Sequence, residues 1–275
     1  MRFKIFTFTA VLLLSGVLAV SAQETADTKE VKDENVAEKF DTKKGLTNGV
    51  QVAEFAILVY SNIGGRPALS QIRKTTIEIG KIKSTNPDGT SVTSEYDQRI
   101  ERAENLEKEK VRLNQRFPDA EYALVYNGNK VFGLYNNSVF TPREDAVSSF
   151  ESRIWHGLEA LLRYKENGAE VKLEKEETIL GVTFYVVSVT DKANRKTTFY
   201  ISKKSFRVMM LEYEENGIKY KRKFYDHNLA QGTLVPYRSV LWADGKIVEE
   251  KDISTIAFGQ TLNDGIFDDP TASTP

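Results

Sequence analysis

Residues 196–226, KTTFYISKKSFRVMMLEYEENGIKYKRKFYD, decide the fold of this chain. Apolar and polar residues alternate through three segments, which are separated by Lys203-Lys204 and Asn216-Gly217. A period of two is typical of strands that are buried on one face. Links this short join antiparallel neighbours, because parallel strands need a dozen or more connecting residues. The stretch therefore predicts three consecutive strands of an antiparallel meander.

The same pattern continues on both sides of this stretch. Turn residues at 191–194 and 244–245 divide it further. The predicted strands are about 169–178, 182–190, 196–202, 206–214, 218–226, 234–243 and 247–258.

The segment from about 71 to 131 also shifts toward a period of two. Ile77 and Ile79 alternate with less apolar neighbours, and the sequence NPDG at 86–89 predicts a turn into a strand at about 91–103. The sequence NG at 127–128 is a strong hairpin signal. A sheet of ten or so strands must curl or close.

Two segments have the helical period instead. Apolar residues recur at steps of three and four from Val52 to Ile63, and Gly64-Gly65 ends that pattern. A second helix is predicted over about 142–166, because TPRE at 141–144 resembles a capping box. Its broad apolar stripe must be buried against something large, and a curved sheet is the obvious partner.

One long helix over a curled antiparallel sheet predicts a mainly β, α+β fold: an incomplete β-barrel with a helical lid. The concave side of such a sheet is lined by alternate residues and can hold a small ligand. The simpler alternative is that these side chains only fill a core. On the strand near 208, either Val208 and Met210 or Met209 and Leu211 could point inward. The candidate cavity residues are Ile77, Ile79, Phe184, Val186, Phe199, Ile201, Met209 and Leu211, and the candidate lid residues are Phe150, Ile154, Trp155, Leu158 and Leu161.

The N-terminus predicts export. Residues 1–22 combine a short basic start, an uncharged apolar run and a small-residue cleavage site, which is typical of a secretory signal peptide. An uncleaved anchor is the alternative, but the run is shorter than a spanning helix needs. Residues 23–45 predict a flexible charged leader, 46–268 a single domain, and 269–275 a loose tail. We expect a soluble protein in the periplasm or outside the cell.

Composition excludes several kinds of chemistry. The chain has 38 basic and 39 acidic residues, and removal of Arg2 and Lys4 leaves 36 against 39, so no basic face for nucleic acid is expected. There is no cysteine, and only His156 and His227 could serve a metal site or a catalytic triad. No phosphate loop or nucleophile motif occurs. We therefore expect no enzyme, metal or cofactor. An exported hydrolase with a histidine beside a carboxylate is an alternative to this expectation.

Four short motifs resemble a known family, the LolA-like periplasmic proteins that carry and sort outer-membrane lipoproteins. The motifs are IGGRPAL at 63–69, LGVTFYVV at 180–187, TFYI at 198–201 with FRV at 206–208, and GTLVP at 232–236 with LNDGIF at 262–267. The resemblance covers about residues 50–268. Arg112 is the nearest match to an arginine that this family has in an early strand, so it joins the candidate cavity residues.

The resemblance implies an apolar cavity that carries acyl chains of lipoproteins or other lipids across an aqueous compartment. Membrane-bound donor and acceptor proteins would then be partners, and a monomer is expected. A lipid-sensing or envelope-assembly module of the same fold, which transports nothing, is the main alternative.

Overall fold

The computed structural model describes residues 45–270, except Asn129 and Asn137. The predicted signal peptide, nearly all of the leader and residues 271–275 of the tail therefore lie outside the described residues. Within the described part, no helix is both long enough and apolar enough to cross a membrane.

All the described strands belong to one antiparallel sheet of 13 strands, in the order β6-β5-β4-β3-β2-β1-β13-β12-β11-β10-β9-β8-β7. Each strand pairs with the next one along the chain, except that β6 does not pair with β7, and β1 pairs with the last strand, β13. The bounds are β1 (Thr75–Thr85), β2 (Ser91–Glu101), β3 (Lys110–Arg116), β4 (Glu121–Asn127), β5 (Lys130–Tyr135), β6 (Ser138–Phe140), β7 (Glu170–Ile179), β8 (Val182–Thr190), β9 (Lys196–Ser202), β10 (Val208–Glu215), β11 (Ile218–Ala230), β12 (Thr233–Ala243) and β13 (Lys246–Phe258).

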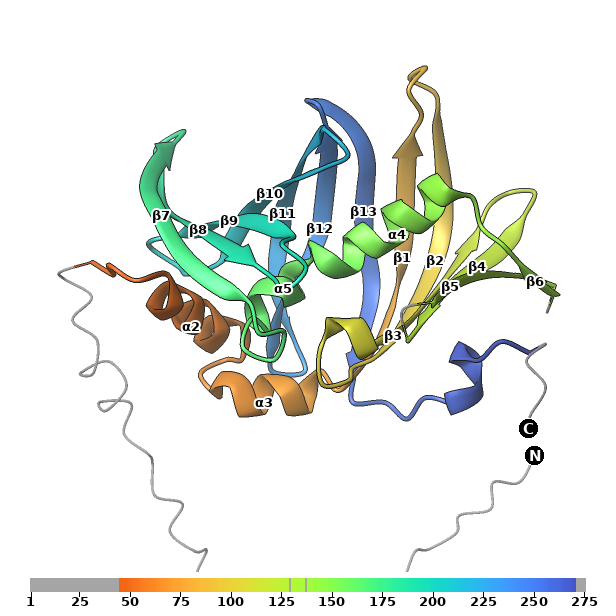
Figure 1. The fold of residues 1–275 in the computed structure, drawn as a ribbon, viewed down its shortest axis with the longest axis horizontal. Coiled ribbons are helices and arrows are strands. Elements are labelled where there is room, and N and C mark those ends of the chain that lie inside the picture. The colour runs from red at the N-terminus through yellow and green to blue at the C-terminus, as the bar shows by residue number, and fades with distance from the viewer. Residues whose placement is uncertain (1–44, 129, 137, 271–275) are drawn as a thin grey trace, which may run out of the picture. The chain divides into compact units, whose positions relative to one another are not determined.

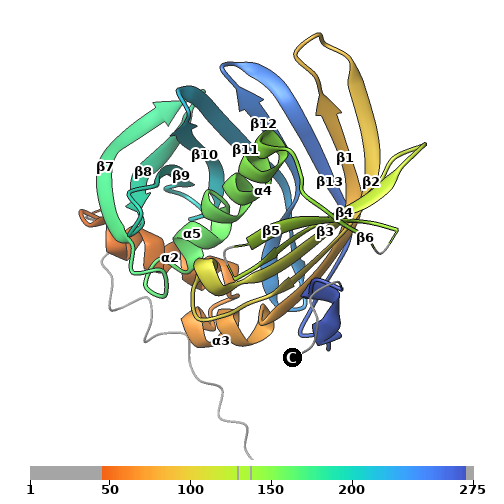
Figure 2. The same cartoon turned by 45° about the vertical axis from the view of Figure 1, so that its right-hand side comes forward.

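The sheet curls, but β6 and β7 remain as its two edges, so it does not close. Figures 1 and 2 show the strands curving around α4 (Glu144–Trp155) and α5 (Leu158–Leu162), which lie across the concave face. The predicted incomplete β-barrel with a helical lid is confirmed. The seven predicted C-terminal strands, 169–178 through 247–258, correspond to β7 through β13, with ends that differ by a few residues.

The first predicted helix is also present, as α2 (Gly49–Tyr60). The side chain of Asn48 accepts a hydrogen bond from the Val50 N–H and caps its start. The helix packs on the β7 edge so closely that a Cβ at Gly49 would lie 2.5 Å from the Leu173 backbone nitrogen. The following α3 (Gly65–Ile72) was not predicted, since its eight residues are too few to define a period.

The predicted helix over 142–166 is instead two helices. α4 ends at Trp155, and α5 begins at Leu158 after Gly157, which has an extended backbone. A Cβ at Gly157 would lie 2.8 Å from the Arg153 carbonyl oxygen, so this bend requires glycine. The predicted capping box does not form, because Arg143 is the N-cap and no side chain caps the helix start.

The two sheet faces bury different clusters. The concave face carries most of the core, beneath α2, α4 and α5. Two short 3-10 turns complete the described chain, η2 (Leu106–Lys108) and η3 (Asp264–Phe267). Phe267 of η3 is fully buried with Ala123, Val125 and Leu134, which alternate with core residues and so belong to the convex face. The segment that contains η3 thus covers part of the convex face of the sheet.

Candidate functional site

A cavity of about 200 Å³ lies between the α4–α5 pair and the concave face of the sheet. One wall of this cavity is apolar. Ile253, Ile256 and Phe258 of β13 face Val235 and Tyr237 of β12 there, and these side chains form a cluster of their own beside the main core. We call these five residues the apolar wall.

A buried ion cluster beside the cavity ties the lid to the sheet. The carboxylate of Glu249 on β13, which is only 4% exposed, forms an ion pair with Arg153 of α4 at 2.6 Å and accepts a hydrogen bond from Arg222 of β11 at 3.1 Å. Burial opposes ionisation of Glu249, but the positive charges of Arg153 and Arg222 outweigh it and hold its pKa at about 2. Glu249 is therefore ionised at neutral pH and holds α4 in place.

A second carboxylate, Glu78 of β1, lines the cavity and joins β1 to the two strands beside it, β13 and β2. Glu78 forms an ion pair with Lys251 at 2.5 Å and accepts a hydrogen bond from the Tyr96 hydroxyl at 2.9 Å. Ser152 of α4 also donates to Glu215 at the end of β10. The concave face under α4 therefore combines the apolar wall with charged groups.

His156 lies where α4 ends and lines the same cavity. Its Nδ1 lies 2.7 Å from the Thr197 hydroxyl, and its ring stacks on Tyr213 with the centroids 4.0 Å apart. Burial lowers the pKa of His156 to about 4, so the ring is neutral at pH 7. The buried Nε2 of His227 has no hydrogen-bond partner among the described residues. The hydrogen bond of His156 is therefore to a hydroxyl group and not to the carboxylate that the hydrolase alternative requires.

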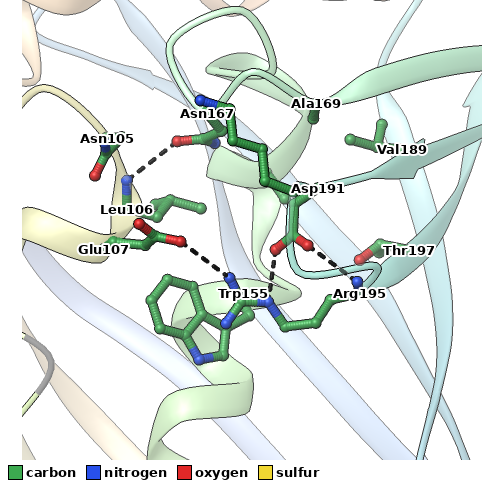
Figure 3. Close-up of a pocket in the computed structure, with 12 residues that line it drawn as sticks. Asn105, Leu106, Glu107, Trp155, Asn167, Ala169, Val189, Asp191, Arg195 and Thr197 are labelled. Carbon is green, nitrogen blue, oxygen red and sulfur yellow. Dashed lines mark hydrogen bonds and ion pairs between the residues drawn. The ribbon is translucent and has the colours of Figure 1, made fainter.

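A small pocket of about 40 Å³ lies beside the C-terminal end of α4, and the residues that line it hold this end of the helix. Figure 3 shows the Arg195 side chain extended toward Trp155, and the guanidinium lies 3.8 Å from the indole ring centroid. Asp191 fixes Arg195 at 2.5 Å, and Asn167 accepts from the Leu106 N–H at 3.1 Å. Contacts among η2, α4 and the β8–β9 turn thus close this end of the lid.

The structure brings together three of the candidate cavity residues. Phe199, Ile201 and Leu211 are fully buried in the same core cluster as the candidate lid residues Phe150, Ile154 and Leu161, with Trp155 and Leu158 packed against it. Of all these, only Leu158 lines the cavity. This part of the concave face is therefore filled by its own side chains.

Phe184, Val186 and Met209 lie elsewhere, which differs from the prediction. Val186 pairs with Tyr200, whereas Val187 pairs with Phe199, so Phe184 and Val186 face the opposite side from the core. They form a separate cluster with Tyr200 and Met210, and Met209 packs on it at a register shift in β10. Because β8 is apolar on both faces, alternation could not show which face is inward.

The predicted positions on β1 and β3 also differ. Ile77 pairs with Arg99 and Ala257, while Glu78 pairs with Ile256, so Ile77 and the 43% exposed Ile79 face the convex side. Arg112 donates to the Ile266 carbonyl at 2.9 Å and so holds η3 instead of facing the cavity.

The sequence did not reveal the residues that line the cavity, because polar residues on strands were expected to face solvent. The missed lining residues are Thr76, Glu78, Arg153, Arg222, Lys251 and the apolar wall, and Glu249, which binds Arg153 beside the cavity, was missed with them. A usable signal was present in the apolar Ile253, Ile256 and Phe258 near the end of the last strand.

Comparison with known proteins supports the class of fold. No protein-family model and no curated protein matches the sequence. Among solved structures, the chain has the fold of the LolA superfamily.

Three of these structures illustrate the likeness. A LolA superfamily protein from Nitrosomonas europaea has a TM-score of 0.56 at 12% identity, over 81% of this chain and 98% of its own. An outer membrane lipoprotein-sorting protein domain from Vibrio parahaemolyticus has a TM-score of 0.50 at 14% identity, over 82% and 97%. A DUF1329 family protein from Desulfovibrio piger has a TM-score of 0.57 at 13% identity, over 80% and 97%. At these identities the likeness concerns the fold alone.

Proposed function

We propose that this protein is a periplasmic, non-enzymatic carrier that binds acyl chains of lipoproteins or other lipids beneath α4 and α5. The observation that carries the proposal is the apolar wall, whose residues face a cavity instead of the filled core. The LolA-like fold is consistent with this function. Each chain methylene buried there would contribute roughly 0.8 kcal/mol.

The cavity requires α4 to move when a chain enters. Its volume of about 200 Å³ is smaller than the roughly 300–1,000 Å³ of typical ligand sites. α4 is joined to α5 only through the His156-Gly157 bend, and the ion pair between Arg153 and Glu249 ties it to the sheet. Opening would therefore break this ion pair and enlarge the space above the apolar wall.

A second candidate is a lipid-sensing or envelope-assembly module that transports nothing. The small cavity and the tied lid favour it, together with an exposed apolar site at the β7–β8 turn. There Leu180 is 97% exposed and Val182 is 44% exposed. Such a module would bind a chain without transferring it between vesicles, whereas a carrier would transfer it.

Replacing Ile256 by serine should weaken binding of 11-(dansylamino)undecanoic acid, a fluorescent acyl probe, about tenfold, because the apolar wall loses about 1.4 kcal/mol of chain contact. The matched control is Ile77→Ser on the adjacent strand, which faces the convex side and should leave the dissociation constant unchanged. Fluorescence titration measures both. Equal effects of the two substitutions, or no binding by the unmodified protein, would contradict the proposal.

Mass spectrometry of organic extracts is the complementary measurement. The protein purified from its own envelope should carry acyl-chain lipids, and Ile256→Ser should reduce their amount relative to protein. An extract free of acyl chains from both proteins would count against a resident ligand.

A further inference from the structure

A second charged cluster separates the cavity from the protein surface. Arg73, Arg102 and Glu159 line both the cavity and an outer pocket of about 250 Å³ between α3, α5 and the segment that follows β2. Glu109 and Arg163 extend this cluster. We call these five residues the arginine cluster.

The arginine cluster has more positive than negative charge. Glu159 accepts from Arg73 at 2.7 Å and from Arg102 at 3.0 Å, and Glu109 pairs with Arg102 at 3.4 Å and with Arg163. The three arginine side chains are 10% exposed or less. Three guanidinium groups thus face two carboxylates in a poorly solvated place, where an uncompensated charge is costly. The adjacent pocket is also lined by Arg66, Lys74, Glu104 and Glu166, whose charges cancel, so an anion there would balance the excess of the cluster.

The cluster also has donors to spare. The Nε of Arg102 is buried and has no hydrogen-bond partner among the described residues, and the same is true of one acceptor of the cluster, the Oε2 of Glu159. The backbone N–H of Arg102 donates to the backbone carbonyl of Lys74 at 2.9 Å. This bond places the exposed Lys74 beside Arg102 at the rim of the outer pocket. No ion pair of the Lys74 ammonium is found within the described residues. Arginine and lysine side chains together are typical ligands of phosphate and carboxylate groups.

The arginine cluster adjoins the apolar wall directly. The Arg73 guanidinium lies 5.5 Å from the ring centroid of Phe258. An oxyanion held by Arg73 and Arg102 would therefore leave an attached chain against Phe258 and Ile256.

We propose that the ligand is an anionic amphiphile, with a phosphate or carboxylate headgroup at Arg73, Arg102 and Lys74 and an acyl chain along the apolar wall. This inference rests on the proposed function, since it names the ligand class of the same cavity. The headgroup lies in the outer pocket and the chain lies in the inner cavity. Arg73, Arg102 and Glu159, which line both spaces, stand between them.

Isothermal titration with two probes of equal chain length tests the headgroup. Dodecyl phosphate should bind the full mature chain at least about tenfold more tightly than dodecyl maltoside, both below their micelle concentrations, because only the first makes charge-assisted hydrogen bonds. Lys74→Gln, at an exposed position that should not affect folding, and Arg102→Gln should each reduce this preference. Arg99→Gln on the convex face of β2 is the matched control and should leave it unchanged. Thermal unfolding shows whether each variant is folded.

The outcomes separate the two proposals. Equal binding of both dodecyl probes overturns the anionic headgroup and leaves the carrier function standing. No binding of either probe overturns the carrier function and this inference with it. Inorganic phosphate that binds as tightly as dodecyl phosphate would show a free-anion site, which also overturns the amphiphile. A preference that survives Lys74→Gln and Arg102→Gln would place the headgroup elsewhere.

Discussion

Replacing Glu249 by alanine lowers the free energy of unfolding by about 3–5 kcal/mol, as expected when one partner of a buried ion cluster is removed. Arg153 and Arg222 would then face each other without the carboxylate that both now bind. α4 would also lose its main polar contact with β13. Chemical denaturation followed by far-UV circular dichroism measures the loss.

The adjacent Glu250 provides a matched control. Glu250 binds Lys83 at 3.0 Å and Arg238 at 3.3 Å, but these pairs are exposed, and surface ion pairs contribute about 0–1 kcal/mol. Glu250→Ala should therefore change the free energy of unfolding by less than about 1 kcal/mol. Similar losses for the two variants would show that burial of the Glu249 cluster contributes nothing to stability.

The same carboxylate makes stability depend on pH. The pKa of Glu249 is about 2 in the folded chain and near 4.5 without the fold, so the folded state favours the ionised form. Its contribution is complete above pH 4.5 and is lost as the pH falls from about 4.5 toward 2. At about 1.4 kcal/mol per unit, the loss is on the order of 3 kcal/mol.

His156 should add an earlier step in the same direction. Its pKa is 6.5 in the unfolded chain and about 4 when folded, so the unfolded state takes up the proton first and stability falls from pH 6.5 toward 4. Denaturation curves from pH 7 to 3 should show both steps in the unmodified protein. Glu249→Ala should keep the step near pH 6 and lose the one below 4.5. A curve that is flat over this range would contradict both assignments.

Most of the strands could be predicted because the turns between them have chemical signatures. The NG sequences at 127–128 and 216–217 and the DG sequence at 244–245 all occur at hairpin turns of the structure. The short links between strands then predicted that neighbouring strands are antiparallel, and the large number of strands predicted that the sheet curls. Local signals of this kind are sufficient for strand order in a meander.

The inward faces could not be predicted in the same way. Alternation defines two faces of a strand, but it identifies the inner one only when the other face is polar. β8 is apolar on both faces, and β10 shifts register near Met209. On β1 the rule failed outright, because Glu78 faces the cavity and binds Lys251 while Ile79 faces outward.

The buried charges explain this failure in physical terms. An isolated carboxylate is excluded from a protein interior, but one that binds two cations is not. Glu249 and Glu159 each bind two arginines, and Glu78 binds Lys251 and the Tyr96 hydroxyl; most of these partners come from strands or helices distant in sequence. Such long-range pairing is a property of the folded arrangement, so a single strand sequence does not reveal it.

Replacing Phe199 by alanine is the second substitution with a large expected effect, and it tests the assignment of faces. Phe199 is fully buried in the core beneath the lid, where it pairs with Leu211 and Val187. Removal of a phenyl ring from such a core costs about 3–5 kcal/mol, because the surrounding side chains close the void only in part.

Phe184→Ala is the control for the same chemical change on the other face. Phe184 is 7% exposed and belongs to a small cluster with Val186, Tyr200 and Met210. That cluster borders solvent, so its side chains can move into the space, and the loss should be less than about half of that for Phe199→Ala. Urea denaturation of the two variants gives both values. A larger loss for Phe184→Ala would mean that β8 presents its other face to the core, and the cavity would then have to be placed on the opposite side of this strand.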